Sequence, residues 1–210
     1  MNVIVFGATG TIGKHVIEQA LEQGHNVTAF CRTPEKLSAF QHPQLSIALG
    51  DVLQPEKVTQ AIKGQEAVIV VLGSGKKRTG TIRSQGTKNI IEAMQAHDIK
   101  RLICQTTLGA GESRGNLNFF WKYIMFGWFL KEVFLDHELQ EKIVMESNLE
   151  WTIVRPGAFS DGAHTGNYRH GFAYNDRNVK LKISRADVAD FLLKQMQSTS
   201  YLHQTPGLSY

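Results

Sequence analysis

Residues 3–13 decide the fold, and they read Val-Ile-Val-Phe-Gly-Ala-Thr-Gly-Thr-Ile-Gly. The apolar run over residues 3–6 is short, as is typical of a buried parallel strand. Three glycines then recur at three-residue spacing, and an amphipathic segment over residues 14–23 follows: Gly7, Gly10 and Gly13. This order predicts a strand, a glycine turn and a helix start. Glycine lets the backbone approach a ligand and a helix start offers free N–H groups, so we expect a pyrophosphate here, the alternative being a turn that binds nothing.

The end of the next apolar segment bears on which dinucleotide binds. Residues 26–31 predict a second strand, which is followed by Arg32 and Thr33, with no acid before Glu35. An NAD site places Asp or Glu at this point for the ribose hydroxyls, whereas an NADP site carries Arg or a hydroxyl residue for the 2′-phosphate. Arg32 suits a charge-assisted phosphate contact. We therefore expect NADP(H), the alternative being an ordinary solvated arginine.

Composition limits the class of protein. The chain has 210 residues, 42% of them hydrophobic and 20% charged, which is typical of a soluble globular protein. A net charge of +4 fits an anionic cofactor, and the absence of long basic runs gives no indication of nucleic acid. The two cysteines, Cys31 and Cys104, predict reduced buried thiols. We expect a cytoplasmic protein without a signal peptide and without membrane insertion, because the aromatic stretch at 117–130 is too short to span a bilayer.

Strands and helices alternate along the chain. Strands are predicted at residues 3–6, 26–31, 45–49, 67–72, 101–105, 151–154 and 179–183. Helices are predicted at residues 14–23, 34–41, 55–63, 81–97, 131–147 and 185–197. The alternation predicts an α/β protein: one Rossmann domain over residues 1–210, with a doubly wound, mostly parallel sheet and helices on both of its faces.

In such a sheet the ligand lies beyond the carboxyl ends of the strands. These ends are rich in glycine and hydroxyl residues, which are also common in plain turns, but their number favours a site. Asp51 and Val52 are placed to contact adenine, and Gly73 permits close approach to ribose or phosphate. The cofactor residues we expect are Gly7, Thr9, Gly10, Thr11, Ile12, Gly13, Arg32, Thr33, Asp51, Val52, Leu72, Gly73, Arg78, Thr106, Pro156, Gly157, Ala158 and Phe159.

Five segments carry a resemblance to a known family: residues 7–13, 32–37, 50–52, 146–157 and 183–189. They resemble the atypical short-chain dehydrogenases/reductases of the NAD(P)H-binding, NmrA-like group, and the chain is similar to the flavin reductase/biliverdin-IXβ reductase type. The resemblance extends nearly from end to end and is specific for fold and cofactor rather than for substrate. It implies a reductase, although the group also includes redox sensors that are not enzymes.

Ordinary short-chain dehydrogenases use a Tyr-x-x-x-Lys dyad to protonate a carbonyl, and this chain lacks it. Its tyrosines stand at 123, 168, 174, 201 and 210, and none is followed by Lys four residues later. Reduction of a conjugated acceptor needs less from the protein, because contact between hydride donor and ring supplies much of the rate. We therefore expect an NADPH-dependent reductase of a flavin, biliverdin or quinone. The alternative is a non-catalytic NADP(H)-binding redox sensor that binds a protein partner.

Three residues are candidates for catalysis. Thr106 and Thr107 follow the strand at 101–105, where the resemblance implies hydroxyl residues near the nicotinamide; the alternative is an ordinary β-branched strand end. His137 lies where the biliverdin-IXβ reductase type also has Asp-His, and a near-neutral imidazole tuned by Asp136 or Glu138 can relay a proton. The alternative for His137 is a packing residue.

Two segments are expected on the substrate side: the aromatic insertion at 109–131 and the loop at 157–171. Planar acceptors stack on aromatic side chains, although a dimer face or a core patch is equally consistent with the insertion. In the loop, a cation is available for a substrate carboxylate or phosphate. The substrate residues we expect are Phe119, Trp121, Trp128, Tyr168 and Arg169. We expect no metal, a small-molecule planar acceptor, and a monomer or homodimer.

Overall fold

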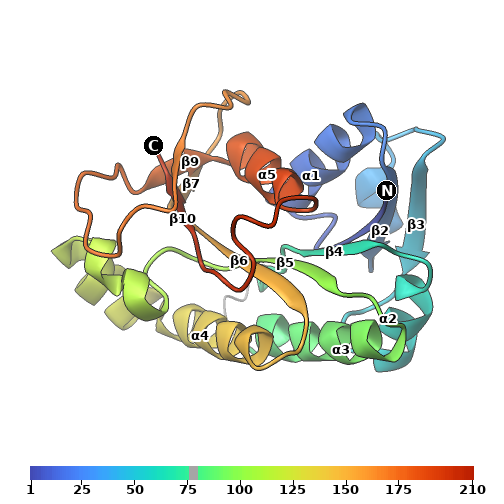
Figure 1. Ribbon diagram of the computed structural model, residues 1–210, viewed down its shortest axis with the longest axis horizontal. Coiled ribbons are helices and arrows are strands. Elements are labelled where there is room, and N and C mark those ends of the chain that lie inside the picture. Colours follow the sequence, from blue (N-terminus) through green and yellow to red (C-terminus); the bar gives the residue numbers. More distant parts are fainter. Residues whose placement is uncertain (76–79) are drawn as a thin grey trace.

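The computed structural model describes residues 1–75 and 80–210, and within them one sheet has the strand order β3-β2-β1-β4-β5-β6-β10-β8 (Figure 1). The predicted doubly wound, mostly parallel sheet is confirmed, since neighbouring strands from β3 to β10 run parallel and β8 alone of the sheet's strands is antiparallel. The strands are β1 (Asn2–Phe6), β2 (Asn26–Cys31), β3 (Leu45–Leu49), β4 (Ala67–Val70), β5 (Arg101–Gln105), β6 (Glu150–Pro156), β8 (Arg169–His170) and β10 (Gly207–Ser209).

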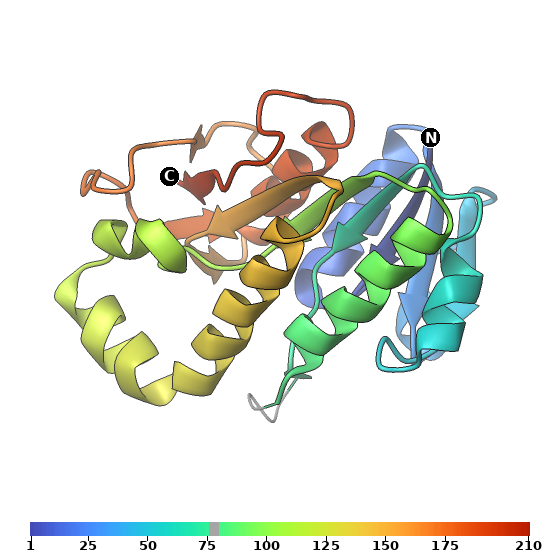
Figure 2. The same cartoon turned by 60° about the horizontal axis from the view of Figure 1, so that its bottom comes forward.

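Helices cover both faces of the sheet (Figures 1 and 2). One face carries α1 (Thr11–Glu22) and α5 (Arg185–Lys194), and the other carries α2 (Pro55–Ile62), α3 (Ile82–Ala96) and α4 (Lys131–Met145). Because successive strand residues point to opposite faces, β1 supplies both cores: Val3 and Val5 pack with α1 and α5, whereas Ile4 and Phe6 pack with α2 and α3. Because β1 is buried on both of its faces, its residues from Val3 to Phe6 are all apolar.

The strand order reverses beside β1, with β2 and β3 on one side and β4, β5 and β6 on the other. In open sheets of this kind the crevice outside the carboxyl ends at the reversal is where ligands bind. The register brings Phe6 level with Phe30 of β2 and with Val70 of β4. The residues that follow these three strands therefore gather at one edge.

Several elements differ from those predicted. The helix expected at 34–41 is a single 3₁₀ turn (η1, Pro34–Leu37), since His42 and Pro43 follow closely and the residue before a proline is disfavoured in a helix. The strand expected at 179–183 begins later, as β9 (Lys182–Ser184), and pairs with β7 (Ala158–Ser160) outside the main sheet. The strands β7, β8 and β10 were not predicted, because two or three residues leave no periodic pattern.

The aromatic insertion is helical. A short 3₁₀ segment (η3, Gly111–Asn116) leads to a segment with π-type turns (η4, Phe120–Phe129), which runs directly into α4. Cys31 and Cys104 are both free and buried, as predicted. Among the described residues, none of the helices has the length and apolar character needed to cross a membrane.

Candidate functional site

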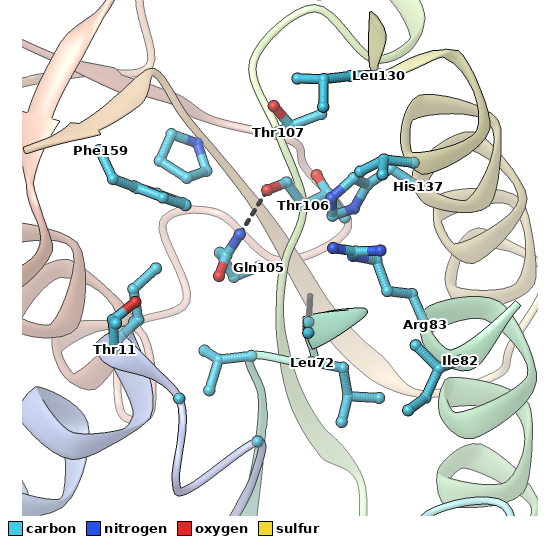
Figure 3. Close-up of a pocket in the computed structure, with 18 of the residues that line it drawn as sticks. Thr11, Leu72, Ile82, Arg83, Gln105, Thr106, Thr107, Leu130, His137 and Phe159 are labelled. Carbon is cyan, nitrogen blue, oxygen red and sulfur yellow. Dashed lines mark hydrogen bonds between the residues drawn. The ribbon is translucent and has the colours of Figure 1, made fainter. Parts of the chain in front are cut away.

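A cavity of about 530 Å³ opens at the carboxyl ends of the central strands. It extends from the glycine turn after β1 and the ends of β2 and β3 to a wall built by α3, η4 and α4. Figure 3 shows Thr11 and Phe159 reaching it from one side and Arg83 and His137 from the other. Most of the predicted site residues line it: Gly7, Thr9, Gly10, Thr11, Ile12, Arg32, Asp51, Val52, Leu72, Gly73, Thr106, Thr107, Trp121, His137, Pro156, Gly157, Ala158 and Phe159.

The glycine turn requires glycine for its own packing as well as for access. Gly7 has φ +91°, and a Cβ there would lie 2.4 Å from the carbonyl oxygen of Val71. A Cβ at Gly13 would lie 2.3 Å from the carbonyl oxygen of Gly7, so Gly13 holds α1 against the turn without lining the cavity. Gly10 precedes α1, whose first turn has no side-chain cap and no acidic residue. This helix start fits an anionic diphosphate, since its free N–H groups face no competing carboxylate.

Cations and one carboxylate line the cavity near the ends of β2 and β3. Arg32 Nη1 lies 3.4 Å from Asp51 Oδ2, and the Arg32 side chain is 65% exposed. Lys36, from η1, also lines the cavity, although no role was predicted for it. Thr33 does not line the cavity and precedes η1 instead. Arg78, expected to contact the cofactor, lies outside the described residues. Two cations near one strand end fit a ribose phosphate.

At the end of β5 the two predicted threonines differ in their surroundings. Thr106 is fully buried and its hydroxyl donates to Glu141 Oε1 at 2.6 Å. Glu141 also accepts from Arg155, at 2.9 Å from Nε and 2.7 Å from Nη2, so the Thr106 hydroxyl belongs to a buried ionic network. Thr107 is half-buried, and its hydroxyl has only a 3.4 Å contact to the carbonyl oxygen of Leu108. Thr107 is therefore the hydroxyl that is free to meet a ligand.

His137 is buried on α4, and its pKa is lowered to about 3 by burial and by the positive charge of Arg83, although a bond to Gln140 opposes the shift. The imidazole is consequently neutral near physiological pH. Asp136, expected to tune His137, faces α3 instead and accepts from the backbone N–H groups of Arg83 and Ser84. His137 can therefore offer or accept a hydrogen bond, but it is a weak base.

Four apolar lining residues come from the aromatic insertion and its junction with α4: Leu117, Trp121, Phe126 and Leu130. Their spacing of four, five and four residues follows the wide turns of η4, in which the N–H of Leu130 bonds the carbonyl of Met125 five residues earlier. Phe126 stacks on Phe134 of α4 with ring centroids 4.9 Å apart. In an α-helix, with 3.6 residues per turn, Phe126 and Leu130 would not share a face with Trp121.

The structure does not bring the other predicted substrate residues to the cavity. Phe119 and Trp128 point outward, and Trp128 is 78% exposed. Tyr168 donates to Asp190 beside α5, and burial together with that carboxylate raises its pKa. Arg169, on β8, pairs with Asp176 at 2.6 Å. These four side chains serve the outer surface or the C-terminal packing.

Three polar lining residues were not predicted from the sequence: Lys36, Arg83 and Gln105. Gln105 donates to the carbonyl oxygen of Thr106 at 2.6 Å (Figure 3). A signal for Arg83 does exist in the sequence: it precedes Thr87, Ile90 and Met94 at helical spacing and therefore belongs to the buried face of α3. A cation on an otherwise buried helix face marks a site or an ion pair.

The chain matches known proteins over nearly its whole length. The model of a family described as NAD(P)H-binding matches residues 7–199. Photosystem II assembly factor Ycf39 from Synechocystis sp. is 28% identical over 98% of this chain, which spans only 61% of that relative. A Rossmann-fold NAD(P)-binding family protein from Shigella flexneri is 27% identical, with a TM-score of 0.77 over 99% of this chain and 92% of that one. ChuY, an anaerobillin reductase from Escherichia coli O157:H7, shares the fold at a TM-score of 0.83 and 24% identity, over 100% and 97% of the two chains.

Proposed function

We propose that this chain, which belongs to the NAD(P)H-binding family, is an NADPH-dependent reductase that passes hydride to a conjugated planar acceptor such as a flavin, biliverdin or quinone. The observation that carries the proposal is the continuity of one cavity, from the glycine turn and Arg32 at one end to Trp121 and Phe126 at the other. A cavity that runs past both groups of residues would bring a bound dinucleotide and a flat apolar ring into contact. Bound NADPH would supply the hydride.

The residues proposed to bind the cofactor are chosen by their charge and by the hydrogen-bond donors that they offer. The backbone of residues 10–12 at the start of α1 would bind the diphosphate. Arg32, with Lys36 near it, would bind the 2′-phosphate, and Asp51 and Val52 would border the adenine. Residues 156–159, at the far end of the sheet edge, would border the nicotinamide half together with Thr106. The Thr106 hydroxyl is held by Glu141, so Thr106 would offer the nicotinamide a rigid stretch of backbone rather than a free hydroxyl.

The acceptor half suits a ring that needs little acid catalysis. Trp121 and Phe126 offer stacking faces. His137 is neutral, with its pKa lowered to about 3, so it orients the acceptor by a hydrogen bond rather than protonating it as a strong acid. The Thr107 hydroxyl, half-buried and weakly partnered, passes a proton from solvent to the reduced acceptor. Flavins and quinones are electrophilic enough to accept hydride under these conditions.

A second function, a non-catalytic NADP(H) sensor, is favoured by one surface feature. Phe119, Tyr123, Trp128 and Phe129 leave an apolar outer face on η4, and such faces mark interaction sites. Ycf39, a relative by sequence, is named an assembly factor, which agrees with a role in binding proteins.

The two functions are separated by turnover. We expect the protein to bind NADPH in calorimetry and to consume it, followed by nicotinamide absorbance, when FMN, menadione or biliverdin is added. NADH serves as the matched cofactor control and should be consumed more slowly at equal concentration. Tight NADPH binding without turnover on any of these acceptors would contradict the reductase and support the sensor.

A further inference from the structure

We infer that Arg83 is an anion-binding residue in the acceptor half of the cavity, and that the acceptor carries a carboxylate or a similar anionic oxygen beside its planar ring. That the bound molecule accepts hydride rests on the function proposed above, whereas the binding of an anion by Arg83 does not. The inference adds a charge requirement to a site that is otherwise defined by flat apolar walls. It also explains why a costly group is buried at this place.

Arg83 is a buried cation that lies beside one carboxylate, Asp136, but makes fewer hydrogen bonds than buried arginines ordinarily do. It is 8% exposed, and its Nε and Nη1 atoms are inaccessible and make no hydrogen bond to the described residues. Buried cations are normally both paired and hydrogen-bonded, because a charge taken out of water without these contacts is costly. Burial accordingly lowers the pKa of Arg83, which remains a cation at neutral pH. The third guanidinium nitrogen, Nη2, is accessible and makes no hydrogen bond to the described residues, so it is the atom that a ligand in the cavity can reach.

Asp136 is the nearest carboxylate, and other groups already use its oxygens. Its Oδ1 accepts from the N–H and hydroxyl of Ser84, and its Oδ2 accepts from the N–H of Arg83. The guanidinium Nη1 lies 3.6 Å from Oδ2, beyond hydrogen-bond length. Asp136 therefore caps the start of α3 and holds Arg83 in place by charge, but it leaves the N–H groups of the guanidinium unused.

The surroundings of Arg83 favour an anion. In Figure 3 its guanidinium points into the cavity toward Thr106 and His137. The described lining residues include one carboxylate, Asp51, which lies 3.4 Å from Arg32 Nη1 and is paired with it. His137 is neutral and so does not compete as a cation. In the acceptor half, Arg83 thus supplies the positive charge among apolar walls, and a low local dielectric strengthens its attraction for an anion.

The anion can come from two sources, the acceptor or the cofactor phosphates, and geometry favours the acceptor. The start of α1 and the pair Arg32 and Lys36 already offer phosphate contacts along the cofactor half. Arg83 comes from the opposite wall, with Ile82 on α3 and with Leu130 and Val133 from the η4–α4 side. A flat carboxylate stacked on Trp121 would meet both the apolar wall and the guanidinium. A charge-assisted hydrogen bond from Arg83 Nη2 to a carboxylate oxygen is the contact that this wall offers.

The test compares two flat ligands of equal shape, naphthoate and naphthamide, which differ in charge. Binding to the protein saturated with NADP⁺ is measured by calorimetry or by quenching of tryptophan fluorescence. We expect naphthoate to bind about tenfold to hundredfold more tightly than naphthamide, as for a hydrogen bond to a charged group. Equal affinities, or no binding of either ligand at millimolar concentration, would overturn the inference without any variant being made.

Arg83→Met should remove the preference for naphthoate and leave the NADP⁺ Kd within about twofold. Lys88→Met is the matched control, because Lys88 is an exposed cation on the same helix, paired with Glu92; it should keep the preference. Arg83→Lys retains charge without the planar fork and should keep part of the preference, which guards against a folding defect in Arg83→Met. Weaker NADP⁺ binding in Arg83→Met with the naphthoate preference intact would assign Arg83 to the cofactor and overturn the inference.

These outcomes are independent of the reductase. Loss of the naphthoate preference in Arg83→Met, combined with no turnover on FMN, menadione or biliverdin, would keep the anion site and reject the proposed reaction. Turnover on one of these acceptors without a preference for naphthoate would support the proposed reaction and reject the anion site.

Discussion

The two ends of the cavity are built differently. The half proposed for the cofactor is made of turns that follow β1, β2 and β3, and much of it is backbone: Gly7, Gly10 and the uncapped start of α1. The half proposed for the acceptor is made of side chains from α3, η4 and α4, which are far apart in sequence: Arg83, Trp121, Phe126 and His137. A binding site made of backbone can be predicted from a short glycine motif. A site made of side chains depends on how helices that are distant in sequence pack together.

The end of β5 joins the two halves through a buried ionic network. Arg155 is fully buried and bonds Glu141, which in turn holds the hydroxyl of Thr106. Because a buried carboxylate that loses its cation is strongly destabilising, Arg155→Met should lower the free energy of unfolding by about 3–5 kcal/mol. Urea denaturation measures this effect. If the double variant Arg155→Met/Glu141→Leu is as unstable as the single one, the loss comes from packing and not from the uncompensated charge.

The glycine turn gives the next largest effect and tests the cofactor end. Gly7→Ala adds a Cβ 2.4 Å from the carbonyl oxygen of Val71 at φ +91°, and strain plus overlap should cost about 2–4 kcal/mol, with loss of NADPH binding. Gly24→Ala is the matched control, since Gly24 has φ +77° and nothing within 4 Å; it should cost about 1–2 kcal/mol and leave binding intact. Denaturation and calorimetry report the two quantities. Equal losses in both variants would show that overlap at Val71 is unimportant.

His137 gives the acceptor end a pH signature. Its pKa falls from 6.5 to about 3 on folding, so the unfolded chain binds this proton more readily. The associated stability is complete above pH 6.5 and is lost as the pH falls toward about 3; at about pH 5 the loss is roughly 2 kcal/mol. Stability of wild type and His137→Gln is to be measured at pH 5 and pH 8, and the variant should lack this part of the acid loss. Parallel acid profiles would contradict a buried neutral imidazole.

Arg32 gives the smallest of these effects because it is largely exposed. Arg32→Ala should weaken NADPH binding about tenfold and leave NADH binding unchanged, since a charged phosphate contact is worth about 1.5 kcal/mol at such a site. Arg169→Ala removes a cation that pairs with Asp176 away from the cavity, and it should change neither affinity. An unchanged NADPH to NADH ratio in Arg32→Ala would remove the 2′-phosphate assignment.

The sequence predicted the fold better than it predicted the acceptor half. The apolar run at 3–6, the glycines after it and the alternation of strands and helices are local signals, and the doubly wound sheet and most of the residues at its carboxyl edge follow from them. Arg83 could not be placed in this way, and the sequence alone could not separate Phe126, which lines the cavity, from Phe119 and Trp128, which point outward. Arg83 acts across a helix packing that no short motif records, and the partnership of Phe126 with Trp121 depends on the wide turns of η4. Strands of two or three residues, such as β8, form because β10 lies beside them rather than through propensity of their own.

Two tryptophans seven residues apart test the central claim, that one end of the cavity holds the cofactor and the other holds a flat acceptor. Trp121 lines the cavity, whereas Trp128, on the same segment, faces outward. The measurement is the KM for menadione and for NADPH in Trp121→Ala and Trp128→Ala. We predict that Trp121→Ala raises the menadione KM about tenfold, as for loss of a stacking side chain, with the NADPH KM unchanged, and that Trp128→Ala changes neither. Equal effects of the two substitutions, or no oxidation of NADPH by menadione in the wild type, would contradict the account.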